Sequence, residues 1–114
     1  MTPMHQRDLS AVAWLVFLAA AAIEAGGDAV TRRGLRGGGV PWVVGGGLLL
    51  ATYGVVVNTV KWDFSKLIGV YVGAFALVSV LAGRFALDEH IPLSTWAGLA
   101  IIILGGLVIQ FGAN

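Results

Sequence analysis

The chain has 114 residues, of which 58% are hydrophobic and 11% charged, and its formal net charge is +1. A soluble domain usually has about 25% charged residues, so this composition, with a mean hydropathy of +0.89, indicates a membrane protein. The small net charge argues against a nucleic-acid partner, and the lack of cysteine excludes disulfides and thiolate metal sites. His5 and His90 are far apart in the sequence, and we expect no metal, no cofactor and no enzymatic activity.

The apolar residues are grouped in four blocks, which we expect to form the transmembrane helices of one all-α domain, residues 1–114. The blocks cover residues 9–29, 40–60, 67–87 and 93–111. At about 1.5 Å per residue, each block is long enough to cross the ~30 Å hydrocarbon layer. Because the connections are short, neighbouring helices should be antiparallel. We expect a multi-pass protein of the inner cell membrane.

The start of the first block also has features of a secretory signal peptide. Arg7 precedes the apolar stretch, and small residues follow at positions 20–22. The rest of the chain is equally hydrophobic, however, so cleavage would leave a membrane protein that lacks one span. We therefore favour an uncleaved first helix.

Glu24 is an acidic residue inside the first block, about five residues from the midpoint and so roughly 7–8 Å from the bilayer centre. A charge at this depth costs at least ~2.5 kcal/mol. Ala20, Ala21 and Gly27 are small neighbours on the same helix face, so we expect Glu24 to face a close helix or a cavity. A buried carboxyl without a basic partner can exchange a proton near neutral pH. The alternative is that Glu24 only hydrogen-bonds a neighbouring helix.

The end of the first block and the loop after it are rich in charge. Asp28 lies four residues before Arg32, and we expect the two to form an ion pair at the membrane interface. The positive-inside rule predicts very little orientational bias, with three basic residues on the N-terminal side of the membrane and four on the other. These are Arg7, Lys61 and Lys66 against Arg32, Arg33, Arg36 and Arg84. Either the arginine-rich loop sets one orientation, or the chain inserts in both.

Three aromatic residues in the first three blocks are candidates for contacts with a bound cation: Trp14, Tyr53 and Tyr71. The structural alternative is that they are interfacial or packing aromatics, which we favour for Trp14 and weigh equally for Tyr71.

Glycines recur every seven residues in and just after the fourth block, at Gly98, Gly105 and Gly112, with Gly106 beside them. In lipid, helices associate mainly where small residues allow close contact. The alternative is that glycine is simply common in membrane helices. Since four helices enclose little space, we interpret the stripe as a dimer interface.

Four helices in about 110 residues with one Glu in the first resemble the small multidrug resistance family of the drug/metabolite transporter superfamily. The segment "ALDEHIPLSTWAGLAIIILGGLVI" resembles the loop and last helix shared across that superfamily. Within it, "GLAIIILGG" from Gly98 is similar to the stretch by which small multidrug resistance proteins pair the fourth helices of two subunits. The third helix departs from the family pattern. It opens with "DFSK", where the family often has a Pro-Thr-Gly-like turn and a Trp, and its nearest aromatic is Tyr71. Through "IGVYVGAF" the chain is about as similar to another four-helix branch of the superfamily.

The resemblance implies an antiparallel homodimer of dual-topology subunits, in which the Glu24 carboxyls of both subunits form one site for protons and a cationic substrate. We therefore expect a proton-coupled exporter of small cationic or guanidinium-like solutes in the lipid bilayer. Two alternatives stay open. One is a small accessory subunit that packs against a larger membrane protein, and the other is a lipid-linked sugar flippase subunit of the same superfamily.

Overall fold

The chain folds into four membrane-length helices, which confirms the predicted all-α architecture. The computed structural model describes residues 6–112 and the side chains of residues 10–112, and within this range it has no strand. The helices are α1 (Gln6–Arg33), α2 (Val40–Val57), α3 (Phe64–Phe85) and α4 (Leu93–Phe111). Each is long and apolar enough to cross a membrane, so the protein is a multi-pass membrane protein.

The ends of the helices differ from the predicted blocks for local reasons. α1 has 28 residues and is therefore about 42 Å long, more than the ~30 Å hydrocarbon layer requires. α2 ends at Val57 rather than at residue 60, because the side chains of Asn58 and Thr59 bond the carbonyl oxygens of Gly54 and Val56, each at 2.7 Å. Such bonds satisfy the last helical carbonyls and stop the helix. α3 begins three residues before the predicted block, which places Lys66 in its first turn.

The segment η1 (Gly34–Gly38) reverses the chain between α1 and α2, and the backbone leaves helical geometry at Arg36 and Gly37. Gly37 has φ +111° and Gly39 has φ +96°, in the region that only glycine adopts readily. The guanidinium of Arg33 lies over the Trp42 ring, 4.2 Å from its centroid. The arginine-rich loop predicted from the sequence is thus a tight, glycine-dependent turn.

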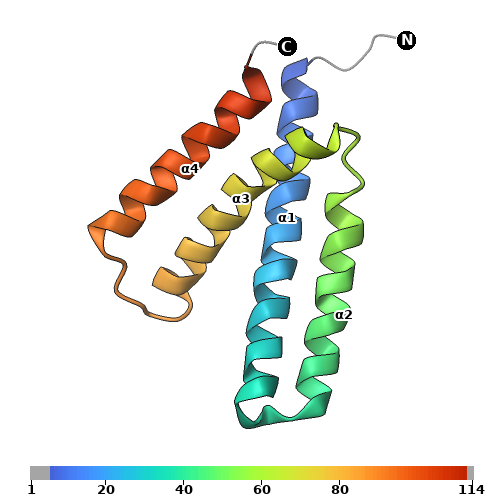
Figure 1. The fold of residues 1–114 in the computed structure, drawn as a ribbon, viewed down its shortest axis with the longest axis vertical. Helices are drawn as coiled ribbons and strands as arrows, with labels where there is room; N and C mark the ends of the chain where they lie inside the picture. Colours follow the sequence, from blue (N-terminus) through green and yellow to red (C-terminus); the bar gives the residue numbers. More distant parts are fainter. Residues whose placement is uncertain (1–5, 113–114) are drawn as a thin grey trace.

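The four helices form two antiparallel hairpins, α1–α2 and α3–α4 (Figure 1). The two helices of the α1–α2 hairpin pack closely because Gly46 of α2 has no side chain. A Cβ at this position would come within 2.7 Å of the backbone nitrogen of Thr31 and within 2.8 Å of the backbone oxygen of Gly27. Among the described residues, the backbones of α2 and α4 approach only their own hairpin partner, with α2 also next to η1. α1 and α3 therefore make the main connection between the two hairpins.

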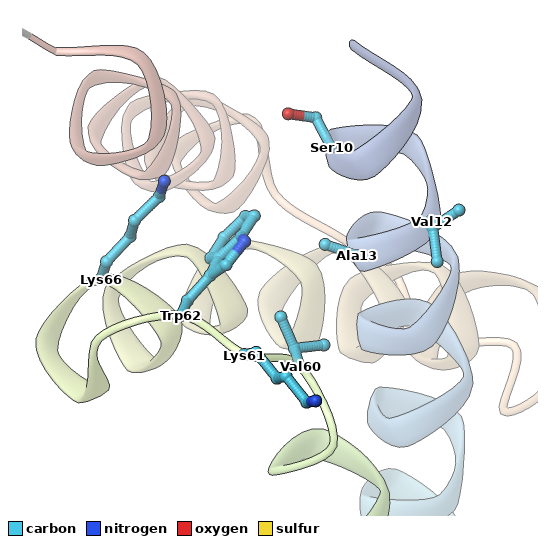
Figure 2. A pocket seen from close by; sticks show the side chains of 7 residues that line it. All are labelled: Ser10, Val12, Ala13, Val60, Lys61, Trp62 and Lys66. Atoms are coloured by element: carbon cyan, nitrogen blue, oxygen red, sulfur yellow. The ribbon is translucent and has the colours of Figure 1, made fainter. Parts of the chain in front are cut away.

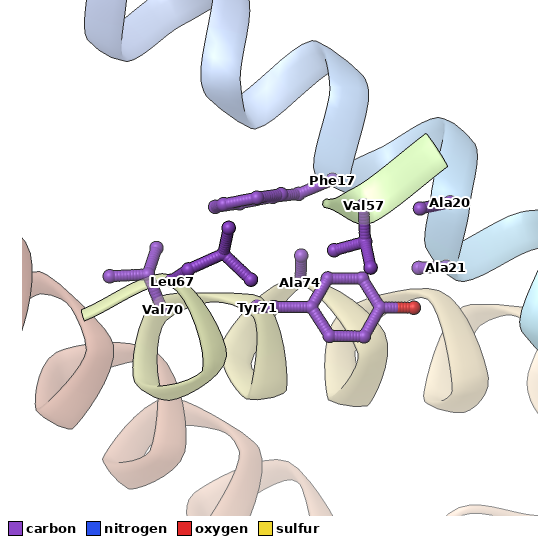
Figure 3. Close-up of a cluster of buried hydrophobic side chains, with 8 residues drawn as sticks. All are labelled: Phe17, Ala20, Ala21, Val57, Leu67, Val70, Tyr71 and Ala74. Carbon is purple, nitrogen blue, oxygen red and sulfur yellow. The ribbon is translucent and has the colours of Figure 1, made fainter. Parts of the chain in front are cut away.

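The core lies where α3 crosses the first half of α1 (Figure 3). α1 contributes Phe17, Ala20 and Ala21, each fully buried. The small alanines let α3 approach closely, as is usual for helix contacts in lipid. The rest of the cluster consists of Val57 at the end of α2 and four residues of α3, which are Leu67, Val70, Tyr71 and Ala74.

Beyond this crossing α1 and α3 diverge, and the two hairpins splay apart (Figure 1). A groove of about 540 Å³ opens between the second halves of the two helices. Its lining includes Ala22, Gly26 and Asp28 of α1 and Phe75 and Ala82 of α3. The molecule thus has a packed end and an open end, and Glu24 lies just past the packed residues of α1.

Candidate functional site

Glu24 is hydrogen-bonded within the membrane-spanning part of the molecule by a residue from another helix. The hydroxyl of Tyr71, on α3, donates to Oε1 of Glu24 on α1 at 2.7 Å. Tyr71 is only 4% exposed, whereas Glu24 is partly exposed. A phenol that donates to a carboxylate forms a charge-assisted bond, which is stronger than a neutral one. The carboxylate is therefore held in place, with one side of it accessible.

Tyr53 of α2 completes an aromatic wall beside this carboxylate. Its ring stacks on that of Tyr71, with the centroids 5.4 Å apart and an angle of 28° between the planes. Three helices thus each provide one side chain to the site: Glu24 from α1, Tyr53 from α2 and Tyr71 from α3. Stacked aromatic faces next to a carboxylate combine the two features that attract an organic cation, a negative charge and electron-rich rings.

The position of Tyr71 is set by aromatic packing from its other sides. Phe17 meets it edge to face at 5.8 Å, and Phe75 lies 6.3 Å away. Phe17 itself is completely buried and packs edge-on against Trp62 at 5.4 Å. Such contacts favour one ring orientation, so the Tyr71 hydroxyl stays directed at Glu24.

Trp14, the third predicted aromatic, lies elsewhere on α1. It is ten residues before Glu24, which corresponds to about 15 Å along the helix. Its indole N–H donates to Oε1 of Gln110, on α4, at 2.7 Å. The structure therefore brings Glu24, Tyr53 and Tyr71 together but places Trp14 in the contact between α1 and α4.

Asp28 and Arg32 do not form the predicted ion pair. Between residues 10 and 112, the one ion pair within 4.0 Å joins Arg84 and Asp88, at 3.9 Å. Asp28 and Arg32 are both exposed and line the groove between α1 and α3. Exposed pairs gain little energy from contact and lose side-chain freedom, which explains why this prediction was wrong.

The glycines at the end of the chain fall on two sides of α4. Gly98 and Gly105 have open space where a Cβ would be, while Gly106 faces α3, where an added Cβ would lie 3.7 Å from the Val70 backbone. Gly112 lies just past the helix, and its N–H bonds the carbonyl oxygen of Val108 at 2.7 Å. The predicted stripe therefore has two members within the helix, both on its outer face, and Gly106 belongs to the packing inside the hairpin.

Phe17 and Gln110 were not identified from the sequence, although one of them has a signal there. Gln110 is an amide near the end of an otherwise apolar stretch, and polar side chains in membrane helices usually bond a neighbouring helix. Phe17 has no such signal, because one phenylalanine in an apolar helix does not differ from another until its neighbours are known.

The comparisons with known proteins identify a relative. Over 94 residues, the chain is 31% identical to a UPF0060 membrane protein of Desulfitobacterium hafniense (strain Y51), and the match covers 80% of this chain and 86% of the relative. No protein-family model matches the chain, and no solved structure matches it.

Proposed function

This chain belongs to the UPF0060 family of membrane proteins, and from its site we propose that it is a proton-coupled exporter of small cationic or guanidinium-like solutes. Glu24 is the group that takes up either a proton or the cation. Tyr71 and Tyr53 provide the aromatic surface against which the cation lies.

The observation that supports this proposal is a carboxylate with an aromatic wall and no basic partner. In the described part of the chain, no Lys or Arg lies within 4.0 Å of Glu24, and its contact is the neutral hydroxyl of Tyr71. A carboxylate at this depth in the membrane is costly when charged. Its charge is best balanced by a bound proton or by a cation, and the two compete for the same oxygen atoms.

A guanidinium ion or small organic ammonium suits this arrangement. A planar guanidinium can donate two parallel hydrogen bonds to a carboxylate and stack on an aromatic face at the same time. In the proposed cycle, loss of the proton frees Glu24 for the cation, and the loaded protein changes which membrane face the site opens to. The contact between the α1–α2 and α3–α4 hairpins is the most suitable place for that movement, because α1 and α3 are packed over only part of their length.

We extend the proposal to an antiparallel homodimer, in which two Glu24 carboxyls share the site. The outer face of α4 is apolar and exposed, with Ile101, Leu104 and Val108 each at least 60% exposed. Gly98 and Gly105 have room on the same helix for a close neighbour. The small difference in basic residues between the two sides supports insertion in both orientations.

The test is cation flux driven by a proton gradient in proteoliposomes. Glu24→Gln keeps the size of the side chain and accepts the Tyr71 hydrogen bond but cannot release a proton. We expect guanidinium flux to fall to that of protein-free liposomes, while the purified variant keeps its helical circular dichroism. The matched control is Asp28→Asn, which removes a carboxyl one helical turn away, in the groove, and should leave most of the flux.

The second candidate function is that of a small accessory subunit of a larger membrane protein, and the Tyr71–Glu24 hydrogen bond also supports it. The same bond would exist if Glu24 only fastened α1 to α3. That role predicts that Glu24→Gln transports like the parent, or that neither protein transports when isolated. Flux in the parent that is abolished in Glu24→Gln and retained in Asp28→Asn would exclude it.

A further inference from the structure

A second pocket, of about 510 Å³, lies at the packed end of the molecule (Figure 2), and Glu24 is not part of its lining. Its walls come from the first turns of α1, from the loop between α2 and α3, and from the first turn of α3. The polar residues that line it are Ser10, Lys61, Trp62 and Lys66. No acidic side chain is among the described residues of this lining.

The polar groups of this pocket are suited to an anion. Two lysines line it, and the ammonium of Lys66 lies 4.4 Å from the centroid of the Trp62 ring. Ser10 is only 7% exposed, and Figure 2 shows its hydroxyl directed toward the side on which Trp62 and Lys66 lie. Lys66 is also in the first turn of α3, a 22-residue helix without a side-chain cap, and the N-terminal end of a helix carries partial positive charge.

The place of the pocket in the membrane indicates what the anion is attached to. Lys61 and Trp62 lie in the loop between two membrane helices, at the level where indole and lysine side chains meet lipid headgroups. The lining also includes apolar side chains, among them Val12, which is 48% exposed, and Val60. A free anion would gain nothing from these side chains, whereas the acyl chains of a lipid would pack on them.

We propose that this pocket binds the phosphate headgroup of an anionic phospholipid. The Lys66 ammonium faces the phosphate and the Ser10 hydroxyl donates to a phosphate oxygen. Lys61, whose ammonium points away from Lys66 (Figure 2), adds positive charge from the other side of the pocket, and the acyl chains run along the apolar surface beside Val12. Basic pockets between membrane helices commonly hold anionic headgroups in this way. The site is independent of the proposed transport function, since Glu24 does not line it.

Native mass spectrometry of the full chain in detergent, titrated with phosphatidylglycerol or phosphatidylcholine of the same acyl chains, tests the proposal. We expect phosphatidylglycerol to bind more tightly. Lys66→Gln should weaken it by roughly fivefold, the usual contribution of one basic side chain near an anionic membrane surface, and Lys61→Gln should weaken it by less. The matched control is Arg84→Gln, which removes a basic residue from the α3–α4 end, where Arg84 pairs with Asp88, and should leave the affinity unchanged.

Two results would overturn the proposal. One is equal affinity for the two lipids. The other is an equal loss in Arg84→Gln and the two lysine variants, because the effect would then come from net charge rather than from this pocket.

A third arm of the experiment uses inorganic phosphate as a competitor. Displacement of phosphatidylglycerol at equal concentration would show a site for the free anion instead of a lipid, and a lack of displacement supports the lipid.

Discussion

The two halves of the α1–α3 contact differ sharply. In the first half, Phe17, Ala20 and Ala21 of α1 are fully buried against α3. In the second half, Ala22, Gly26 and Asp28 line an open groove, although Glu24 is the one charged residue of the helix between residues 10 and 27. Glu24 and Tyr71 are bonded near the boundary. The comparison shows that an apolar sequence does not by itself bring two membrane helices together, because lipid solvates apolar side chains as well as a second helix does.

The largest effect is expected when a bulkier side chain is introduced into the packed half. Ala20→Leu places extra carbon atoms in a fully buried position, and we expect a loss of about 1–3 kcal/mol in the free energy of unfolding, as for overpacked cores. Unfolding in mixed dodecylmaltoside and sodium dodecyl sulfate micelles measures it. Ala22→Leu is the matched control, since the same substitution two residues later enters the groove and should cost little. Equal losses in both variants would contradict the difference between the halves.

A second effect is expected from the hydrogen bond at the boundary. Tyr71→Phe removes the donor to Glu24 and keeps the aromatic face, so we expect stability to fall by about 1.5–3 kcal/mol, the usual range for a hydrogen bond to a charged group. Tyr71→Leu removes the face as well, and cation binding should then be weaker than in Tyr71→Phe by about fivefold. Isothermal titration with guanidinium in detergent separates the two roles. If both variants bind the cation like the parent, the aromatic wall is not part of the site.

The smallest effect is expected in the open half. Asp28 and Arg32 are exposed, and their charged groups do not come within 4.0 Å of each other. Asp28→Asn and Arg32→Gln should therefore each change the free energy of unfolding by less than about 0.5 kcal/mol. A double-mutant cycle in the same micelles should give a coupling energy near zero. A coupling of about 1 kcal/mol or more would mean that the two side chains do interact in the membrane, and that the groove closes there.

The four membrane helices and the carboxyl inside the first one could be predicted from the order of residues alone. Both are local properties, since span length depends on consecutive apolar residues and the cost of Glu24 depends on its depth in one helix. Helix ends were predicted less well, because side chains outside the apolar blocks decide them, as Asn58 and Thr59 do for α2. The relationship to a UPF0060 membrane protein agrees with the prediction of a membrane protein.

Which side chains meet depends on how the helices are arranged in space. Tyr71 bonds Glu24, while Trp14, on the same helix as Glu24, bonds Gln110 of α4. Likewise, Gly106 faces α3 and its neighbour Gly105 faces outward. Neither choice has a local signal, because apolar surroundings in lipid allow many helix faces to pack almost equally well. The crossing of α1 over α3 selects among them, and that crossing depends on small residues from both helices at once.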